Sequence, residues 1–125
     1  MHTIYCGLIR DFILYVALIT LSIVVGLTEE KVFSRDSGLR DQIRRSVVSV
    51  ASNLAEGDER DTDKESVRFF YIAKGSLAEL RTQLQIACEI GYLESKIYED
   101  IERECEALGK MIGKLIKVRS GSYSP

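Results

Sequence analysis

Histidine, proline and tryptophan are nearly or wholly absent from this chain, and each absence removes a class of structure or chemistry. The only histidine is His2, which leaves too few imidazoles for histidine-based acid–base catalysis or a histidine metal cluster. The only proline is Pro125, the last residue, so no proline interrupts a helix. The cysteines are Cys6, Cys88 and Cys105, an odd number without C-x-x-C spacing, which favours free thiols in a reducing compartment.

The chain also lacks a strong net charge. Its 17 basic and 19 acidic residues give a formal charge of −2, so attraction to nucleic acid or to an anionic membrane requires a local patch. No glycine-rich phosphate loop and no opposed pair of carboxylates is evident. We therefore expect no enzyme, no bound cofactor and no small-molecule substrate.

What the sequence does contain is apolar residues at helical spacing. The pattern predicts helices at approximately residues 8–29, 38–56, 62–90 and 95–118. The clearest seam runs from Phe70 to Ala87 with a second apolar stripe beside it, and two stripes on one helix require more than one helical neighbour. With 125 residues and 46% hydrophobic composition, the chain is predicted to form one all-α domain, a four-helix bundle over residues 1–125.

Capping residues and glycines mark the predicted helix ends. Asp36 can cap the second helix, and a residue among 61–63 can cap the third. Gly57 is expected to end the second helix as a left-handed C-cap residue, and Gly91 to end the third.

The first predicted helix is unusually apolar, with no charge from Phe12 to Leu27. This run is shorter than the ~20 residues that span a bilayer, so we favour a buried helix over a membrane anchor or signal segment. A helix that is apolar on all sides needs neighbours on all sides, which predicts a homo-oligomer. Leu18→Asp or Ile23→Asp is expected to prevent soluble assembly.

Polar side chains border the predicted interface of the second and third helices. They are Arg44, Arg45, Ser49, Ser52, Asn53 and Glu56 on the second helix and Ser76 and Glu79 on the third. Because buried polar groups must be satisfied, we expect a hydrogen-bonded network that includes an arginine–Glu79 pair. A structural network that sets helix register is the favoured interpretation, and a ligand or partner site is the alternative.

One face of the fourth helix is basic. Lys110, Lys114 and Lys117 lie at steps of four and three, and Arg119 brings the cations to four. A solvated face is the plain interpretation. The alternative is weak, salt-sensitive contact with RNA or DNA phosphates when several copies converge.

Two other groupings are interpreted structurally. Gly109 and Gly113 are expected to mark a close helix contact, because glycine inside a helix costs ~1 kcal/mol and needs a packing reason. The acidic segment 56–63 lacks calcium-loop spacing, so a solvated turn without a metal is expected.

The segment Gly38–Gly57, GLRDQIRRSVVSVASNLAEG, resembles the GLxxQIRRAxxSIxxNIAEG pattern of bundle proteins encoded in intervening sequences of bacterial 23S ribosomal RNA genes. The resemblance continues through residues 68–80, Gln83-Leu84 and 91–93, and covers roughly residues 38–118. The first helix departs from it: Leu14 stands where the family carries tryptophan, and Lys31-Val32 where it carries Phe-Pro.

The resemblance implies a cytoplasmic, up-and-down antiparallel four-helix bundle assembled into a ring of five protomers. Similar bundles act as accessory proteins to reverse transcriptases in diversity-generating retroelements, so RNA or DNA association is the leading hypothesis. A protein-interaction scaffold is the main alternative, and a membrane-anchored helical protein is less favoured. The positions that the resemblance marks as structural or binding are Arg44, Arg45, Asn53, Glu56, Gly57, Gly75, Ser76 and Glu79.

Overall fold

The computed structural model describes residues 2–121, with side chains from residue 10 onward, so the side chains of His2 and Cys6 lie outside the described residues. Within that part the only regular elements are helices, which confirms the all-α class. The helices are α1 (His2–Leu27), α2 (Lys31–Ser34), α3 (Ser37–Asp58), α4 (Asp63–Glu89) and α5 (Ser95–Ser120). The four long helices match the predicted ones, and the one-turn α2 was not predicted.

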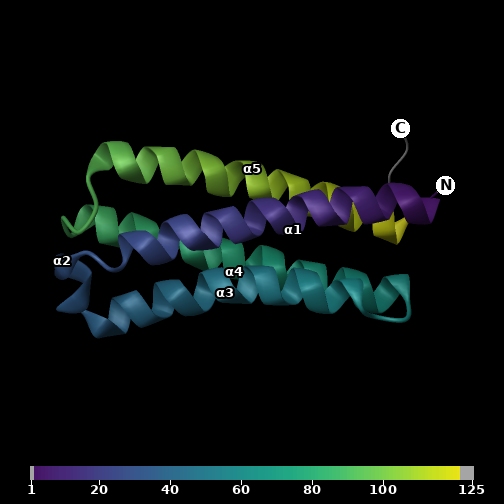
Figure 1. The fold of residues 1–125 in the computed structure, drawn as a ribbon, viewed down its shortest axis with the longest axis horizontal. Coiled ribbons are helices and arrows are strands. Elements are labelled where there is room, and N and C mark those ends of the chain that lie inside the picture. The colour runs from purple at the N-terminus through teal and green to yellow at the C-terminus, as the bar shows by residue number, and fades with distance from the viewer. Residues whose placement is uncertain (1, 122–125) are drawn as a thin grey trace.

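The four long helices lie side by side as an elongated bundle in which successive long helices run in opposite directions (Figure 1). α3 packs on α4 and α4 packs on α5, while α1 packs against both α3 and α5. α1 and α4 therefore lie diagonally across the bundle.

Each long helix turns an apolar stripe toward the bundle axis. The seam predicted on α4 is confirmed, since Phe70, Leu77, Leu84 and Ala87 are all buried. Fully burying one such large side chain stabilises the fold by about 1.5–3 kcal/mol, so the shared core accounts for the side-by-side packing. The remaining large core residues include Ile43, Val47 and Val50 of α3 and Leu108, Ile112 and Leu115 of α5.

The predicted caps are confirmed at three ends. The Asp36 carboxylate accepts a 3.1 Å hydrogen bond from the Leu39 backbone N–H, and the Thr62 hydroxyl accepts one of 3.2 Å from that of Glu65. Gly91 follows α4 with a φ of 86°, which an L side chain rarely adopts.

The prediction that Gly57 ends its helix as a left-handed residue is wrong. α3 continues to Asp58, and among the described residues only Gly91 and Gly121 have positive φ. A Cβ atom at Gly57 would lie 2.6 Å from Cε1 of Phe70 and 3.0 Å from the Ser66 carbonyl oxygen. Glycine is needed here for the close approach of α3 and α4, not for a turn.

The short helix α2 closes one end of the bundle. Phe33 has no exposed surface, and its ring meets that of Tyr92 edge-on, with centroids 5.5 Å apart. The Tyr92 hydroxyl donates a 3.1 Å hydrogen bond to the same Asp36 carboxylate that caps α3. This hydrogen bond raises the pKa of Tyr92, so the phenol stays protonated and the α4–α5 turn stays joined to the start of α3.

α1 buries one face and exposes the other. Ile13, Ala17, Thr20 and Val24 face the core. The exposed large apolar residues of α1 are Phe12, Tyr15, Leu18, Ile19 and Ile23, which we call the outer face of α1. By length and composition Arg10–Leu27 could cross a membrane, a test that core helices and signal segments also pass, and only 22% of this segment is buried. The expectation of neighbours on all sides is therefore not met within one chain.

Candidate nucleic-acid interface

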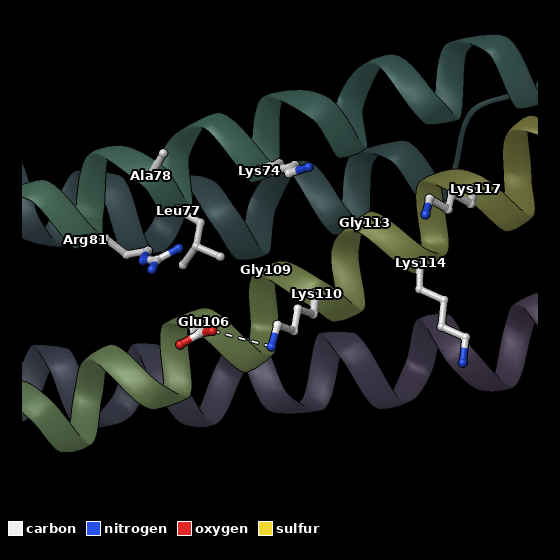
Figure 2. Close-up of a pocket in the computed structure, with 10 residues that line it drawn as sticks. All are labelled: Lys74, Leu77, Ala78, Arg81, Glu106, Gly109, Lys110, Gly113, Lys114 and Lys117. Atoms are coloured by element: carbon white, nitrogen blue, oxygen red, sulfur yellow. Dashed lines mark ion pairs between the residues drawn. The ribbon is translucent and has the colours of Figure 1, made fainter.

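A groove of about 740 Å³ runs between α4 and α5 and brings together basic residues of both helices (Figure 2). Five of its lining residues are basic and one, Glu106, is acidic. The residues that line it are Lys74, Leu77, Ala78 and Arg81 from α4 and Glu106, Gly109, Lys110, Gly113, Lys114 and Lys117 from α5. We call this the α4–α5 groove.

The α5 rim carries the three lysines singled out in the sequence. Lys110, Lys114 and Lys117 are all exposed, and helical spacing places them on one side of α5. Lys110 pairs with Glu106 one turn earlier, at 3.4 Å between Nζ and Oε1. Figure 2 shows the Lys114 side chain extending away from α4. An exposed pair between successive turns contributes little, so Lys110 can exchange its partner for a phosphate at small cost.

Sequence reasoning missed the α4 rim, which carries Lys74 and Arg81. The Nε atom of Arg81 donates a 2.9 Å hydrogen bond to Glu102 of α5, and a second nitrogen of the same guanidinium contacts the same carboxylate oxygen. Hydrogen bonding to Glu102 raises the pKa of Arg81, which is charged in any case. The spacing of Lys74, Ala78 and Arg81 repeats the four-and-three step of the α5 lysines and could have identified this rim.

Small residues form the floor of the groove. A Cβ atom at Gly109 would meet Cδ2 of Leu77 at 3.5 Å, an ordinary contact, so this glycine lies against α4 as expected. At Gly113 a Cβ atom would meet nothing within 4 Å. The expectation that both glycines mark a close contact within the bundle therefore fails at Gly113, where the α5 backbone faces the open groove.

Arg119 lies outside the groove. Its Nε donates a 3.0 Å hydrogen bond to the Asp63 carboxylate, and a terminal nitrogen donates one of 3.0 Å to the Ser66 hydroxyl. Asp63 begins α4 and Ser66 is buried, so Arg119 joins the end of α5 to the start of α4.

The expected polar network between the second and third long helices is present in a smaller form. The hydroxyls of Ser49 and Ser76 lie 2.8 Å apart, and the Asn53 amide donates hydrogen bonds of 2.9 and 3.0 Å to the Ser49 carbonyl and hydroxyl. Glu79 is exposed on α4, and within the described residues no arginine pairs with it. The expected arginine–Glu79 pair is therefore absent from the described residues, and Glu79 faces solvent.

Of the remaining predicted residues of α3, Arg44 and Glu56 make polar side-chain contacts with other described residues and Arg45 does not. The Arg44 guanidinium donates a 2.8 Å hydrogen bond to the Thr28 hydroxyl just after α1, whereas Arg45 is exposed. Glu56 pairs with Arg60, whose guanidinium lies 5.1 Å from the centroid of the Phe69 ring.

Reactive groups are few in the described part of the chain. Cys105 has no exposed surface, and burial raises the pKa of its thiol to about 12, which keeps it protonated and unreactive. Cys88 is a free, half-buried thiol. The described residues bring together no group of three histidine, cysteine or acidic side chains that could hold a metal ion.

The fold and the α4–α5 groove together define a class of protein: a helical bundle with a basic groove along its side. The family model of the 23S rRNA-intervening sequence protein matches residues 16–114, and the chain belongs to that family.

Among solved structures, the chain is similar to a Bacteroides thetaiotaomicron protein of unknown function from the S23 ribosomal protein family. The two share 21% sequence identity with a TM-score of 0.72, over 87% of this chain and 98% of that one, a likeness that establishes the fold alone. No curated protein matches the chain.

Proposed function

We propose that this protein is a non-enzymatic, cytoplasmic homo-oligomer that associates with RNA through the α4–α5 groove. The observation that carries the proposal is the convergence of cations from two helices on one groove, in a chain whose formal charge is −2. An overall negative chain does not attract nucleic acid as a whole, so binding depends on this local concentration of positive charge.

The chemistry of the groove suits phosphates rather than one base sequence. Ammonium groups on flexible stems act as mobile point charges, which adapt to a phosphate backbone. Each phosphate neutralised by such a cation releases condensed counterions, so affinity falls steeply as salt rises. Four lysines and one arginine that is already paired with Glu102 make a weak site in one chain, and several copies on one RNA would raise the overall affinity.

The outer face of α1 supports the oligomeric part of the proposal. Its aromatic and aliphatic residues form a row on one helix, and large exposed apolar patches mark interaction surfaces in soluble proteins. We propose that copies of the chain cover this face. The family resemblance favours a pentamer.

The proposal is tested by fluorescence anisotropy with a structured ribosomal-RNA fragment, across a salt series from about 50 to about 200 mM. The parent is expected to bind in the micromolar range or tighter, and the combined variant Lys110→Gln, Lys114→Gln, Lys117→Gln to bind weakly. The slope of log affinity against log salt should also become shallower by about 1 for each lysine that contacts a phosphate.

The matched control is Lys31→Gln, Lys64→Gln, Lys96→Gln, which removes the same charge from exposed lysines outside the groove. This control should bind RNA nearly as the parent does. Equal loss in both triple variants would show that net charge, not the groove, governs binding. Absence of binding by the parent even at the lowest salt would contradict the proposal and favour a protein-interaction scaffold.

A further inference from the structure

We infer that the α4–α5 groove takes a single strand of RNA, with phosphates on its two basic rims and a base on its glycine floor. This inference rests on the proposed function and adds the form of the nucleic acid that the groove admits.

The two rims are matched in length. Lys74 and Arg81 are seven residues apart on α4, and Lys110 and Lys117 are seven apart on α5, so each rim spans about 10 Å at the helical rise. Both rims border one concavity (Figure 2). A single strand lying along this concavity can place successive phosphates against either rim, because lysine side chains are long and flexible.

The floor between the rims is apolar and shallow. It is formed by Leu77 and Ala78 of α4 and by Gly109 and Gly113 of α5. Glycine is a poor helix former, and no packing within the chain requires it at Gly113, since a Cβ atom there would meet nothing within 4 Å. The missing side chain leaves apolar surface and helix backbone accessible to a flat group between the cations.

A duplex cannot use this floor. Packed helices have axes about 8–10 Å apart, so the concavity between them is narrower than a double helix. A duplex would rest on the lysines of the rims and never reach Gly113. A single strand can enter and turn a base inward, which is how unpaired RNA exposes its bases to proteins.

The groove continues beyond Arg81 into a second, smaller hollow. This hollow has a volume of about 270 Å³ and is lined by Ala78, Arg81, Thr82, Gln85, Tyr98 and Glu102. Burial raises the pKa of Tyr98, so its ring remains a neutral phenol. Tyr98 is partly buried against the core, so the part of it that borders the hollow and the Gln85 amide offer polar groups for an unpaired base rather than a free stacking face.

The test compares the parent with Gly113→Leu on two probes, an RNA of about 12 uridines and the duplex that it forms with oligoadenylate. The leucine fills the floor, changes no charge and improves helix propensity, so folding is retained and is checked by thermal unfolding. The parent should prefer the single strand, and Gly113→Leu should lower single-strand affinity about tenfold. Its duplex affinity should stay unchanged.

Ala107→Leu is the matched control, because Ala107 is also on α5 and is exposed, but does not line the groove. It should bind both probes as the parent does. Equal affinity of the parent for both probes, or a Gly113→Leu variant that binds the single strand unchanged, overturns the inference while the proposed function stands. A change in assembly mass by light scattering in Gly113→Leu, with RNA binding unchanged, would instead assign the groove to a second copy of the chain. Failure of the parent to bind either probe overturns the proposed function as well.

Discussion

Glycine has opposite roles at different positions on these helices. At Gly57 the Phe70 ring occupies the space that a side chain would need, because its Cε1 would lie 2.6 Å from a Cβ atom. At Gly75, in the middle of α4, a Cβ atom would meet nothing within 4 Å. The same residue type is therefore required by packing in one helix and only weakens the other.

Gly57→Ala is expected to lower the free energy of unfolding by about 1–3 kcal/mol, because Phe70 and the Ser66 backbone must move to admit the methyl group. Gly75→Ala is the control and should raise it by about 0.5–1 kcal/mol through helix propensity. Urea denaturation of both variants measures the difference. Equal stability of the two would show that α3 and α4 do not approach closely at Gly57.

Burial of the Cys105 thiol in the core makes the stability of the fold depend on pH. Its thiol has a pKa of about 12 in the folded chain against an ordinary value of 9.0, chiefly because burial disfavours the thiolate. The unfolded chain therefore loses this proton first. The contribution of Cys105 to stability is complete below pH 9.0 and is lost as pH rises toward about 12.

This linkage predicts that Cys105→Ala, although less stable at neutral pH, loses less stability than the parent on the alkaline side. Urea denaturation at neutral pH and at about pH 10.5 measures the two differences. Cys88→Ala, at a half-buried thiol, is the control and should follow the parent. An identical alkaline loss in the parent and in Cys105→Ala would contradict a thiol with a raised pKa.

At the scale of the element, α1 is held in the bundle by two polar contacts as well as by its apolar inner face. The Arg10 guanidinium pairs with Asp58 at the end of α3, and Arg44 hydrogen-bonds Thr28 just beyond the other end of α1. These contacts fix which face of α1 turns outward. The outer face is therefore a surface of the folded chain, and its coverage is a matter of assembly rather than of folding.

Ile23→Asp tests that conclusion. Ile23 is 44% exposed, so a carboxylate there is solvated in one chain and should leave helix content unchanged, while an apolar contact between copies would be lost. Light scattering should show the assembly reduced toward the 14.1 kDa single chain, or no soluble assembly at all. Ile86→Asp is the control, because Ile86 is 46% exposed on α4, diagonally across the bundle. If Ile23→Asp leaves the assembly unchanged, the outer face of α1 takes no part in oligomerisation.

At the scale of the whole molecule, charge is distributed unevenly along α5. Its first half is rich in glutamate and its second half carries Lys110, Lys114 and Lys117. This order suits the helix dipole, which favours acidic residues near the N-terminus and basic residues near the C-terminus. Packing of α4 beside α5 adds Lys74 and Arg81 to the same groove. The groove therefore has two origins. The charge order that stabilises α5 supplies its lysines, and core packing places α4 with its own basic residues beside them.

Local patterns in the sequence are enough to predict the four long helices, their inward faces and most of their ends. Apolar spacing predicted the four long helices because backbone hydrogen bonds and side-chain periodicity in a helix are local. The caps at Asp36 and Thr62 were predictable because each bonds a backbone N–H only three residues away. The four-residue α2 was not, since so short a helix carries no repeating pattern.

The residues that lie opposite each helix could be learned only from the packed bundle. Gly57, expected to end a helix, instead packs against Phe70. Arg119, expected to join the basic face, instead donates hydrogen bonds to Asp63 and Ser66. The packed bundle also places Lys74 and Lys117 on the same groove, although they are far apart in the sequence. The physical reason is that core packing sets the neighbours and rotation of each helix, and the stripe on any one helix does not specify which helix will face it.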